Sequence, residues 1–258
     1  MVFKQPITFP AFNGYNDRML HIYLPNSYDA VENSERHYPV IYMFDGHNLF
    51  SDSEAAFGKS WGLADYLDRT ERQIIVVGIS CNTGPDNARL SEYSPFDFTD
   101  YMFGKTKGYG KKTFDWLINT LKPYVDQNLR TKPNREHTFL GGSSMGGLMA
   151  FYGTMQHNDI FSRCIALSPS IWAGRKSLVK MLHSAKIADN TVVYLDYGNK
   201  EINTLRAMQD ALGEMAKDLI EKGVLITYRL VPDGTHSEAS WERQLPFAFN
   251  TLLYNLPD

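Results

Sequence analysis

Short runs of apolar, mostly β-branched and aromatic residues recur along the chain, and longer amphipathic segments separate most of them. Such runs predict strands at 19–25, 38–44, 73–80, 137–142, 163–168, 191–197 and 224–231. Apolar residues spaced three and four apart predict helices over 113–129, 147–156, 175–185, 203–223 and 240–255. Strands that alternate with helices indicate βαβ units. The pattern therefore predicts an α/β fold with a mostly parallel central sheet and helices on both faces.

Two regions depart from this alternation. No helical segment separates the strands at 19–25 and 38–44, so these first strands are expected to form an antiparallel edge. Region 82–110 is rich in Gly, Pro, Asn and aromatic residues, and we expect a long loop over the sheet edge, a kind of segment that often carries function. No linker divides the chain. Residues 1–258 are thus predicted to form a single domain without a large separate lid.

Composition narrows the classes of protein that this pattern allows. Apolar residues make up 43% of the chain, and the net charge is -3 with both signs scattered, so we expect neither a nucleic-acid partner nor a membrane surface. No apolar run approaches the length of a membrane span, and no signal peptide is recognisable. Cys81 and Cys164 lie in apolar runs, which predicts buried free thiols and a cytoplasmic protein. Composition leaves open whether the protein forms a homo-oligomer.

The segment 137–153, HTFLGGSSMGGLMAFYG, places two serines between two pairs of glycines where a predicted strand meets a predicted helix. Its centre fits the pattern G-x-S-x-G with Ser144 in the middle. In that motif the nucleophile occupies a strained turn, so the residues two positions away must be small. Ser143 fails this test because Met145 would occupy one of those positions. The motif predicts Ser144 as nucleophile and the Met145 amide, at a helix N-terminus, as an oxyanion donor.

A serine nucleophile needs a general base, which is usually a histidine. In hydrolases of this topology the order along the chain is nucleophile, acid, histidine, which leaves His157, His183 and His236. His157 follows a helix at a polar end, and His183 lies within a helical segment. His236 lies in a loop directly after the last predicted strand, where ligands of such sheets bind. We therefore predict His236 as the base.

Two carboxylates near the penultimate strand could orient that histidine. Asp196 falls at the end of the strand, where it can still belong to the ladder. Glu201 follows a Gly-Asn turn that can redirect the chain toward His236, and its longer side chain suits the greater span. Geometry favours Glu201 and leaves Asp196 as the alternative.

The second oxyanion donor should come from the loop after strand 38–44, which reads DGHNLF. Gly46 allows a turn there, so we predict the amide of His47 as this donor. His47 precedes the serine and lacks the companion ligands of a metal site, which argues against a base or metal ligand. The predicted site needs no metal and no cofactor.

Aromatic residues around these segments are candidates for a substrate wall. Trp172 lies in SPSIW, and Tyr93 opens the aromatic stretch 93–103. Packing at the rim of the site is the alternative interpretation of both. Arg89 and Glu92 are candidates for an ion pair that holds this stretch.

With these residues in place, the chain resembles the esterase family of α/β-hydrolases. This family includes esterase D (S-formylglutathione hydrolase), feruloyl and acetylxylan esterases, enterochelin-type siderophore esterases and mycolyltransferases. The similar segments occur in order from about residue 18 to 255 and read YPVIYMFDGHNLF, ARLSEYSPF, FLGGSSMGGLMA, ALSPSIW, DYGNKE and DGTHSEASWERQLP. The resemblance implies the α/β-hydrolase fold and places the acid at Glu201. Stretches typical of esterase D around the histidine are absent, so no particular substrate carries over.

The sequence thus predicts a serine carboxylester hydrolase that acts through Ser144, His236 and Glu201 and an acyl-enzyme. The expected partner is a small or carbohydrate-linked ester. A thioesterase or acyltransferase with the same triad is the alternative, and a non-catalytic binding protein on this scaffold is a weaker one.

Overall fold

The computed structural model describes residues 1–9, 14, 16–201 and 205–257. Its strands are β1 (Val2–Thr8), β2 (Asp17–Tyr23), β3 (Val40–Phe44), β4 (Ile75–Ile79), β5 (Phe98–Asp100), β6 (Gly104–Thr106), β7 (Thr138–Ser143), β8 (Arg163–Leu167), β9 (Val192–Gly198) and β10 (Leu225–Val231). Over these described residues, eight strands form one sheet in the order β1-β2-β4-β3-β7-β8-β9-β10. The strands from β4 to β10 in this order are parallel, whereas β1 and β2 form an antiparallel edge. The predicted mostly parallel sheet is confirmed.

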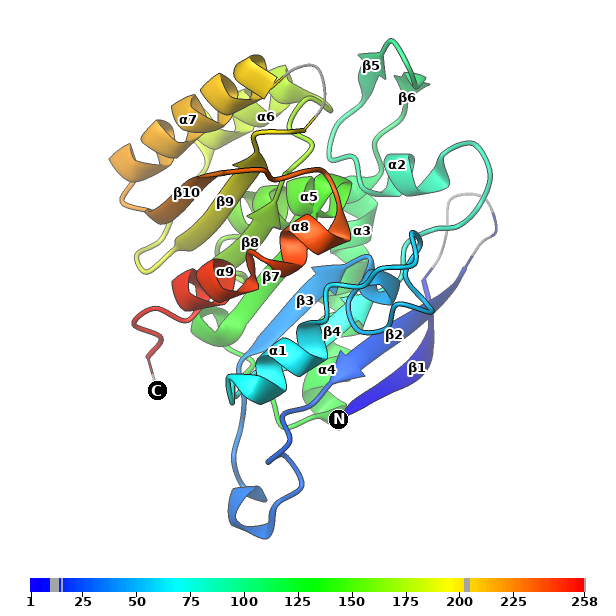
Figure 1. Ribbon diagram of the computed structural model, residues 1–258, viewed down its shortest axis with the longest axis vertical. Coiled ribbons are helices and arrows are strands. Elements are labelled where there is room, and N and C mark those ends of the chain that lie inside the picture. The colour runs from blue at the N-terminus through cyan, green and yellow to red at the C-terminus, as the bar shows by residue number, and fades with distance from the viewer. Residues whose placement is uncertain (10–13, 15, 202–204, 258) are drawn as a thin grey trace.

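Helices cover both faces of this sheet (Figure 1). They are α1 (Leu63–Arg69), α2 (Ala88–Glu92), α3 (Gly110–Trp116), α4 (Lys122–Asn128), α5 (Ser144–Gln156), α6 (Arg175–Ser184), α7 (Leu205–Glu221), α8 (Glu238–Glu242) and α9 (Leu245–Leu252). Residues of α1, α8 and α9 pack in one apolar cluster, and residues of α3 to α7 pack in a second one on the opposite face. The molecule therefore has three layers.

Strand β3 shows why the sheet must be covered on both sides. All five of its residues are buried. Val40, Tyr42 and Phe44 point to one apolar cluster, while Ile41 and Met43 point to the other. Side chains alternate between the two faces of a strand, so an uninterrupted apolar run can be buried only between two layers of helices.

The structure confirms the seven predicted strands and corrects one expectation about their arrangement. The strand at 38–44 does not belong to the antiparallel edge, because β3 lies inside the sheet and runs parallel to both β4 and β7. The antiparallel edge consists of β2 and the unpredicted β1, whose residues alternate between exposed and half-buried positions. Such an edge strand has no apolar run, which is why the apolar pattern missed it.

The predicted helices are also present, with three differences in detail. A π-helical turn joins α3 to α4 within 113–129, and the helix at 240–255 is divided into α8 and α9. Helix α1 was not predicted. Residues 203 and 204 of the predicted helix 203–223 lie outside the described residues.

Region 82–110 is more ordered than the long loop that its composition indicates. It contains α2 and the β5–β6 hairpin, and the hairpin projects beyond the sheet at the top of Figure 1. Phe98 and Phe103 pack against Trp172 with ring centroids 5.6 and 5.8 Å apart. These long-range aromatic contacts stabilise the hairpin, and local sequence pattern does not report them.

Two further expectations concern thiols and membranes. Cys81 and Cys164 are buried free thiols, as predicted. Among the described residues, no helix has the length and apolar character needed to cross a bilayer.

Packing of α5 against α3 gives a stability prediction. A Cβ added at Gly153 would lie 2.1 Å from Cζ of Phe114 and 2.7 Å from Cδ1 of Leu140. Although alanine favours helices, Gly153→Ala should lower the free energy of unfolding by roughly 1–3 kcal/mol through overpacking. Gly213, within α7, is the control because, apart from its own helix backbone and chain neighbours, nothing lies within 4 Å of its added Cβ.

Gly213→Ala should raise the free energy of unfolding by about 0.5–1 kcal/mol. Urea denaturation of both variants measures the difference. Equal effects of the two substitutions would contradict the tight α5–α3 contact.

Candidate active site

Ser144 occupies a strained turn where β7 ends and α5 begins. Its φ is 56°, in the left-handed region, whereas Ser143 is extended with φ -124°. The turn leaves no room for side chains on either side. A Cβ at Gly142 would lie 2.6 Å from the carbonyl carbon of Gly146, and one at Gly146 would lie 2.9 Å from Cβ of Phe44. The strained residue is the one that the motif singles out, and only glycine fits two positions away.

His236 and Glu201 form a direct contact at the same edge of the sheet. Nδ1 of His236 lies 2.8 Å from Oε2 of Glu201. The carboxylate is almost completely buried, with 2% of its side chain exposed, whereas the imidazole is 43% exposed. The Gly198 amide donates to Oε1 of Glu201 at 2.8 Å. Glu201 is therefore held from behind, and the imidazole faces the open edge of the site.

The hydroxyl of Ser144 lies beside a second serine. Its Oγ is 3.3 Å from Oγ of Ser170, whose amide also donates to the Ser144 carbonyl oxygen at 3.0 Å. Within the described part of the chain, no hydrogen bond joins Ser144 to His236. Hydrogen bonds between nucleophile and base are often long in the absence of substrate and shorten when it binds. The structure thus brings the two residues to one edge without pairing them.

Asp196, the alternative acid, lies below this edge and does not contact His236. It is buried, and its carboxylate accepts hydrogen bonds from the Ser168 amide at 2.9 Å and from the Tyr194 hydroxyl at 3.1 Å. Burial raises the pKa of Asp196 to about 7, and the nearby Glu201 contributes in the same direction. The structure places Glu201 rather than Asp196 next to the histidine.

Ser168, which no sequence motif indicates, links both acids to the histidine loop. Its hydroxyl donates to Oε1 of Glu201 at 2.6 Å, and the Trp241 indole N–H donates to that same hydroxyl at 3.0 Å. The Trp241 ring packs edge-on against His236, with centroids 5.1 Å apart. Ser168 also has a left-handed backbone, with φ 42°. The segments ALSPSIW and SEASW held these residues, but no local pattern indicated that they would touch.

Both predicted oxyanion donors lie in the first turn of a helical segment. His47 belongs to the one-turn helix Gly46–Asn48 after β3, and Met145 is the second residue of α5. Amides in first turns have no partner within their own helix, so they can donate to a ligand. A Cβ at Gly146 would lie 3.0 Å from Oδ2 of Asp45, which shows how closely the two turns approach. Burial lowers the pKa of His47, which favours a neutral imidazole.

A cluster beside this turn has the residue types of a metal site. Ligand atoms of Asp45, His47 and Cys81 lie within 4.8 Å of one another. Both carboxylate oxygens of Asp45, however, accept hydrogen bonds from Arg89, with 2.7 Å to Nε and 2.7 Å to Nη2. A metal cation would have to displace or approach this guanidinium, and like charges repel. The cluster is therefore better suited to the Arg89 ion pair than to a metal.

Tyr93 does not have the position expected of a substrate wall. Only 1% of it is exposed, because its ring packs edge-on against Phe44 with centroids 5.1 Å apart. Its hydroxyl accepts a hydrogen bond from the Asp45 amide at 3.3 Å. Tyr93 thus supports the turn after β3 from below. Trp172 is partly exposed at the rim, where it packs with the β5–β6 hairpin.

The expected ion pair between Arg89 and Glu92 is also wrong. Arg89 pairs with Asp45, and Glu92 pairs with Arg18 at 2.7 Å in the interior. The two residues lie on the same short helix, α2, but each binds a different part of the protein.

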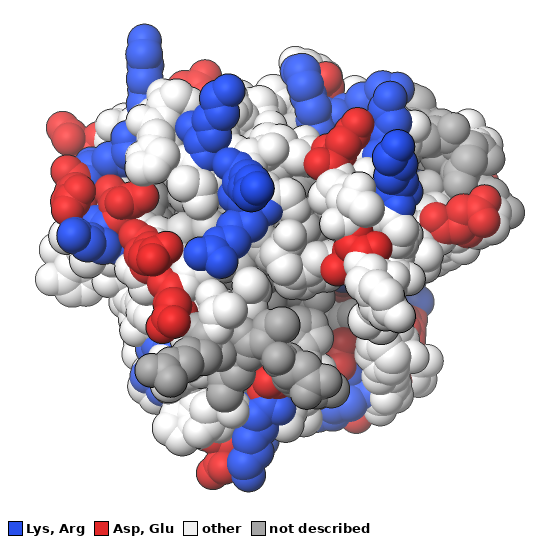
Figure 2. Space-filling model, turned by 90° about the horizontal axis from the view of Figure 1, so that it is seen from above, with Lys and Arg blue, Asp and Glu red and all other residues white. Residues whose placement is uncertain are grey.

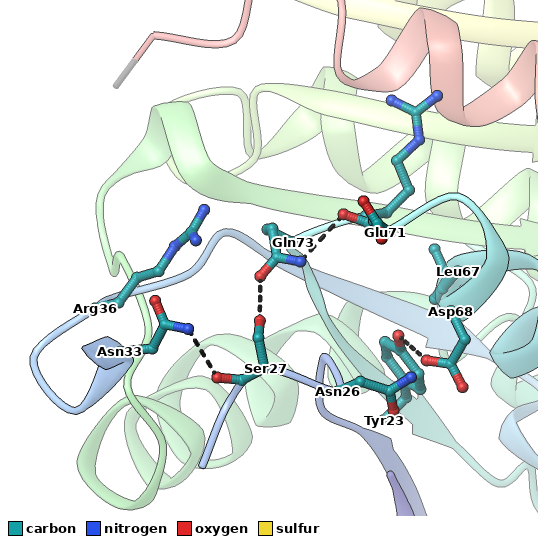
Figure 3. Close-up of a pocket in the computed structure, with 10 residues that line it drawn as sticks. Tyr23, Asn26, Ser27, Asn33, Arg36, Leu67, Asp68, Glu71 and Gln73 are labelled. Atoms are coloured by element: carbon teal, nitrogen blue, oxygen red, sulfur yellow. Dashed lines mark hydrogen bonds between the residues drawn. The ribbon is translucent and has the colours of Figure 1, made fainter. Parts of the chain in front are cut away.

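Other cavities lie away from this edge. One of about 460 Å³ is lined by residues of β2 and α1 and of the segments that follow them. Figure 3 shows its polar groups bonded to one another: Ser27 donates to Gln73 at 2.8 Å, and Tyr23 donates to Asp68 at 2.7 Å. It contains no paired nucleophile and base. The chemistry-bearing residues are instead those that follow β3, β7, β8, β9 and β10.

The face seen from above carries both signs of charge. Lys and Arg side chains run across its middle, and groups of Asp and Glu side chains flank them (Figure 2). This face therefore presents charged groups of both signs around the end of the molecule where α6 and the β5–β6 hairpin lie.

The sheet order and the strained serine turn between β7 and α5 define the α/β-hydrolase fold. The sequence model of a family described as "Putative esterase" matches residues 15–252. The chain belongs to this family, and it is a carboxylic ester hydrolase.

Individual relatives are distant. "Uncharacterized protein YbbA" of Bacillus subtilis is 24% identical over 80% of this chain and 80% of its own length. An "Endo-1,4-beta-xylanase/feruloyl esterase" of Xylanibacter ruminicola is 24% identical over 93% of this chain but only 30% of its own. The crystal structure of an "IroE-like serine hydrolase" from Shewanella oneidensis superposes with a TM-score of 0.74 at 19% identity, covering 99% of this chain and 80% of that one. At this identity the superposition shows the fold alone.

The contact between His236 and Glu201 gives a prediction for activity. Glu201→Gln should keep the fold but lower kcat roughly 10⁴-fold, because an amide neither stabilises an imidazolium nor selects the correct tautomer. Asp196→Asn is the matched control, since it is isosteric and does not touch His236. Steady-state kinetics at equal folded fraction measures both. A near-normal Glu201→Gln beside an inactive, folded Asp196→Asn would transfer the orienting role to Asp196.

Burial of Asp196 predicts a pH-dependent stability. Its pKa is raised from 3.8 to about 7, so the folded protein keeps a proton there that the unfolded chain has lost. Stability from this group is therefore complete at low pH and declines as the pH rises from about 4 to about 7. Asp196→Asn removes the titrating group. The free energy of unfolding of the variant, relative to that of wild type, should therefore increase as the pH rises through this range and stay constant at higher pH.

Urea denaturation at pH 5 and pH 8 checks this difference, with the exposed Asp189→Asn as the control. An Asp196→Asn difference that is the same at both pH values would contradict the inferred proton at Asp196.

Proposed function

We propose that this esterase is a serine hydrolase in which Ser144 is the nucleophile, His236 the general base and Glu201 the residue that orients His236. The observation that carries the proposal is the 2.8 Å contact between His236 and a buried Glu201 at the edge where Ser144 occupies its strained turn. The amides of His47 and Met145 form the oxyanion hole. The position of both amides in first helical turns supports this role.

The reaction begins when the Ser144 oxygen attacks the ester carbonyl carbon. Its proton moves to Nε2 of His236, because Nδ1 donates to Glu201 and leaves Nε2 as the acceptor. Negative charge then develops on the carbonyl oxygen, where the two amides donate to it. Collapse breaks the bond to the alcohol, which leaves with the proton from Nε2, and an acyl group remains on Ser144.

Water completes the cycle. It attacks the acyl carbon and gives its proton to His236, and a second collapse releases the acid and returns the proton to Ser144. Throughout, Glu201 stays ionised and stabilises the imidazolium. No step calls for a metal or an organic cofactor.

The substrate we propose is a small or carbohydrate-linked ester. The name of one relative includes feruloyl esterase, so feruloyl esters are the first substrates to test. We also propose a cytoplasmic location, which the two buried free thiols support.

Covalent labelling tests the proposal. A fluorophosphonate probe should label wild type on Ser144, and Ser144→Ala should abolish labelling and lower kcat by roughly 10⁴-fold or more. Ser143→Ala is the matched control and should retain labelling and substantial activity, since Ser143 ends a buried strand. Labelling that survives Ser144→Ala would refute the assignment.

A substrate panel then separates ester hydrolysis from its alternatives. It contains p-nitrophenyl esters, acetylated sugars, feruloyl esters and thioesters, each with and without an added alcohol acceptor. Faster turnover of thioesters would indicate a thioesterase. Product esters formed from the added alcohol would indicate an acyltransferase.

A further inference from the structure

We propose that Arg89 is a positioning residue for the oxyanion loop, defined as residues 45–48, and that it acts through Asp45. The inference rests on the proposed function, because it assumes that the His47 amide binds the oxyanion. Arg89 itself is assigned no contact with substrate.

The contact between Arg89 and Asp45 is bidentate. Nε and Nη2 of Arg89 donate to Oδ1 and Oδ2 of Asp45, both at 2.7 Å. Parallel bonds of this kind fix both the distance and the plane of the carboxylate. The Asp45 side chain is 6% exposed and that of Arg89 is 35% exposed. The ion pair is thus shielded on the side of the carboxylate, where solvent competes least.

Asp45 needs such support because its backbone is strained. Its φ is 58°, in the left-handed region that residues with a Cβ adopt at a cost. The Tyr93 hydroxyl accepts a hydrogen bond from the Asp45 amide at 3.3 Å, and Arg89 holds the Asp45 side chain. The Asp45 carbonyl in turn accepts the Asn48 amide at 2.9 Å. These contacts set the direction in which the peptide before His47 points.

Helix α2 is itself held in place by contacts with other elements. It carries Arg89 at its start and Glu92 at its end, and Glu92 forms a buried ion pair with Arg18 at 2.7 Å. The Thr113 hydroxyl donates to the Glu92 carbonyl at 3.0 Å, which joins α2 to α3. A guanidinium on a fixed helix holds a loop more firmly than one on a mobile segment.

Charge gives Arg89 a second effect on the loop. The Asp45 carboxylate is one residue from Gly46 and two from His47, and its negative charge would oppose an oxyanion forming nearby. The guanidinium neutralises that charge. Loss of Arg89 should therefore raise the free energy of the transition state more than that of the complex with bound substrate.

Kinetics of Arg89→Gln tests this role. We expect kcat to fall by roughly 10- to 100-fold with KM changed by less than about threefold, since removing an oxyanion donor outright costs about 10²–10³-fold. A trifluoromethyl ketone forms a tetrahedral oxyanion on Ser144, and its Ki should rise by the same factor as kcat/KM falls. Arg89→Lys keeps the charge but cannot span both oxygens, so its effect should be intermediate.

The control is Arg135→Gln. Arg135 makes several hydrogen bonds to Asn158 and Thr191 at a distance from the site, so its loss should lower Tm without changing kcat or Ki. If Arg89→Gln behaves like Arg135→Gln, Arg89 is merely structural. If KM rises while kcat is kept, Arg89 binds substrate directly. Either result overturns the inference.

A second variant keeps the test decisive. If Arg89→Gln does not fold, Arg89→Lys carries the test, and its Ki should rise together with the loss of kcat. An unchanged Ki in this variant overturns the inference. Failure of the proposed function gives a different result, because wild type would then not be labelled by the fluorophosphonate or inhibited by the ketone.

Discussion

Ser144 holds a left-handed backbone conformation at the junction of β7 and α5, which costs on the order of 1–3 kcal/mol for a residue with a side chain. The turn persists because the surrounding structure determines it from both sides: β7 pairs with β3 and β8, and α5 is buried along almost its whole length. Gly142 and Gly146 meet where no side chain fits. This one constraint lifts the serine hydroxyl above the sheet and starts a helix whose first amides face the same space. The other site residues are arranged around a position that the turn has already set.

Around that turn, the segments after the neighbouring parallel strands β8, β9 and β10 are tied together by a few buried contacts. Ser168, after β8, donates to Glu201, after β9, and accepts from Trp241, which packs on His236, after β10. Asp196 lies within β9 and Glu201 follows it, and the two differ in role because their surroundings differ. Asp196 is enclosed below the edge, where burial raises its pKa, whereas Glu201 has one oxygen held by protein donors and the other facing the imidazole. These buried polar groups are stable because each of them has a hydrogen-bond partner.

The segment between β4 and α3 supports the site from outside the sheet. Arg89, Glu92 and Tyr93 bind three different groups, namely the Asp45 carboxylate, the Arg18 guanidinium and the Asp45 amide. The conformational entropy lost when a long connection of this kind becomes ordered is offset only by its contacts with the rest of the molecule.

The sequence by itself determined the class of fold and pointed to Ser144 and His236 as the nucleophile and base proposed here, whereas it left Asp196 as an alternative to Glu201. Apolar runs such as that of β3 can be buried only in a sheet covered on both faces, and a serine flanked by glycines two residues away indicates a strained turn. The edge strand β1, the course of region 82–110 and the partners of Arg89, Glu92 and Tyr93 were decided by tertiary structure. Their contacts join residues far apart in sequence, such as Arg89 with Asp45, and neither spacing nor residue type reports which distant group will lie within hydrogen-bonding distance. Periodicity is a local property of the chain, whereas a buried ion pair depends on where two separate elements are packed.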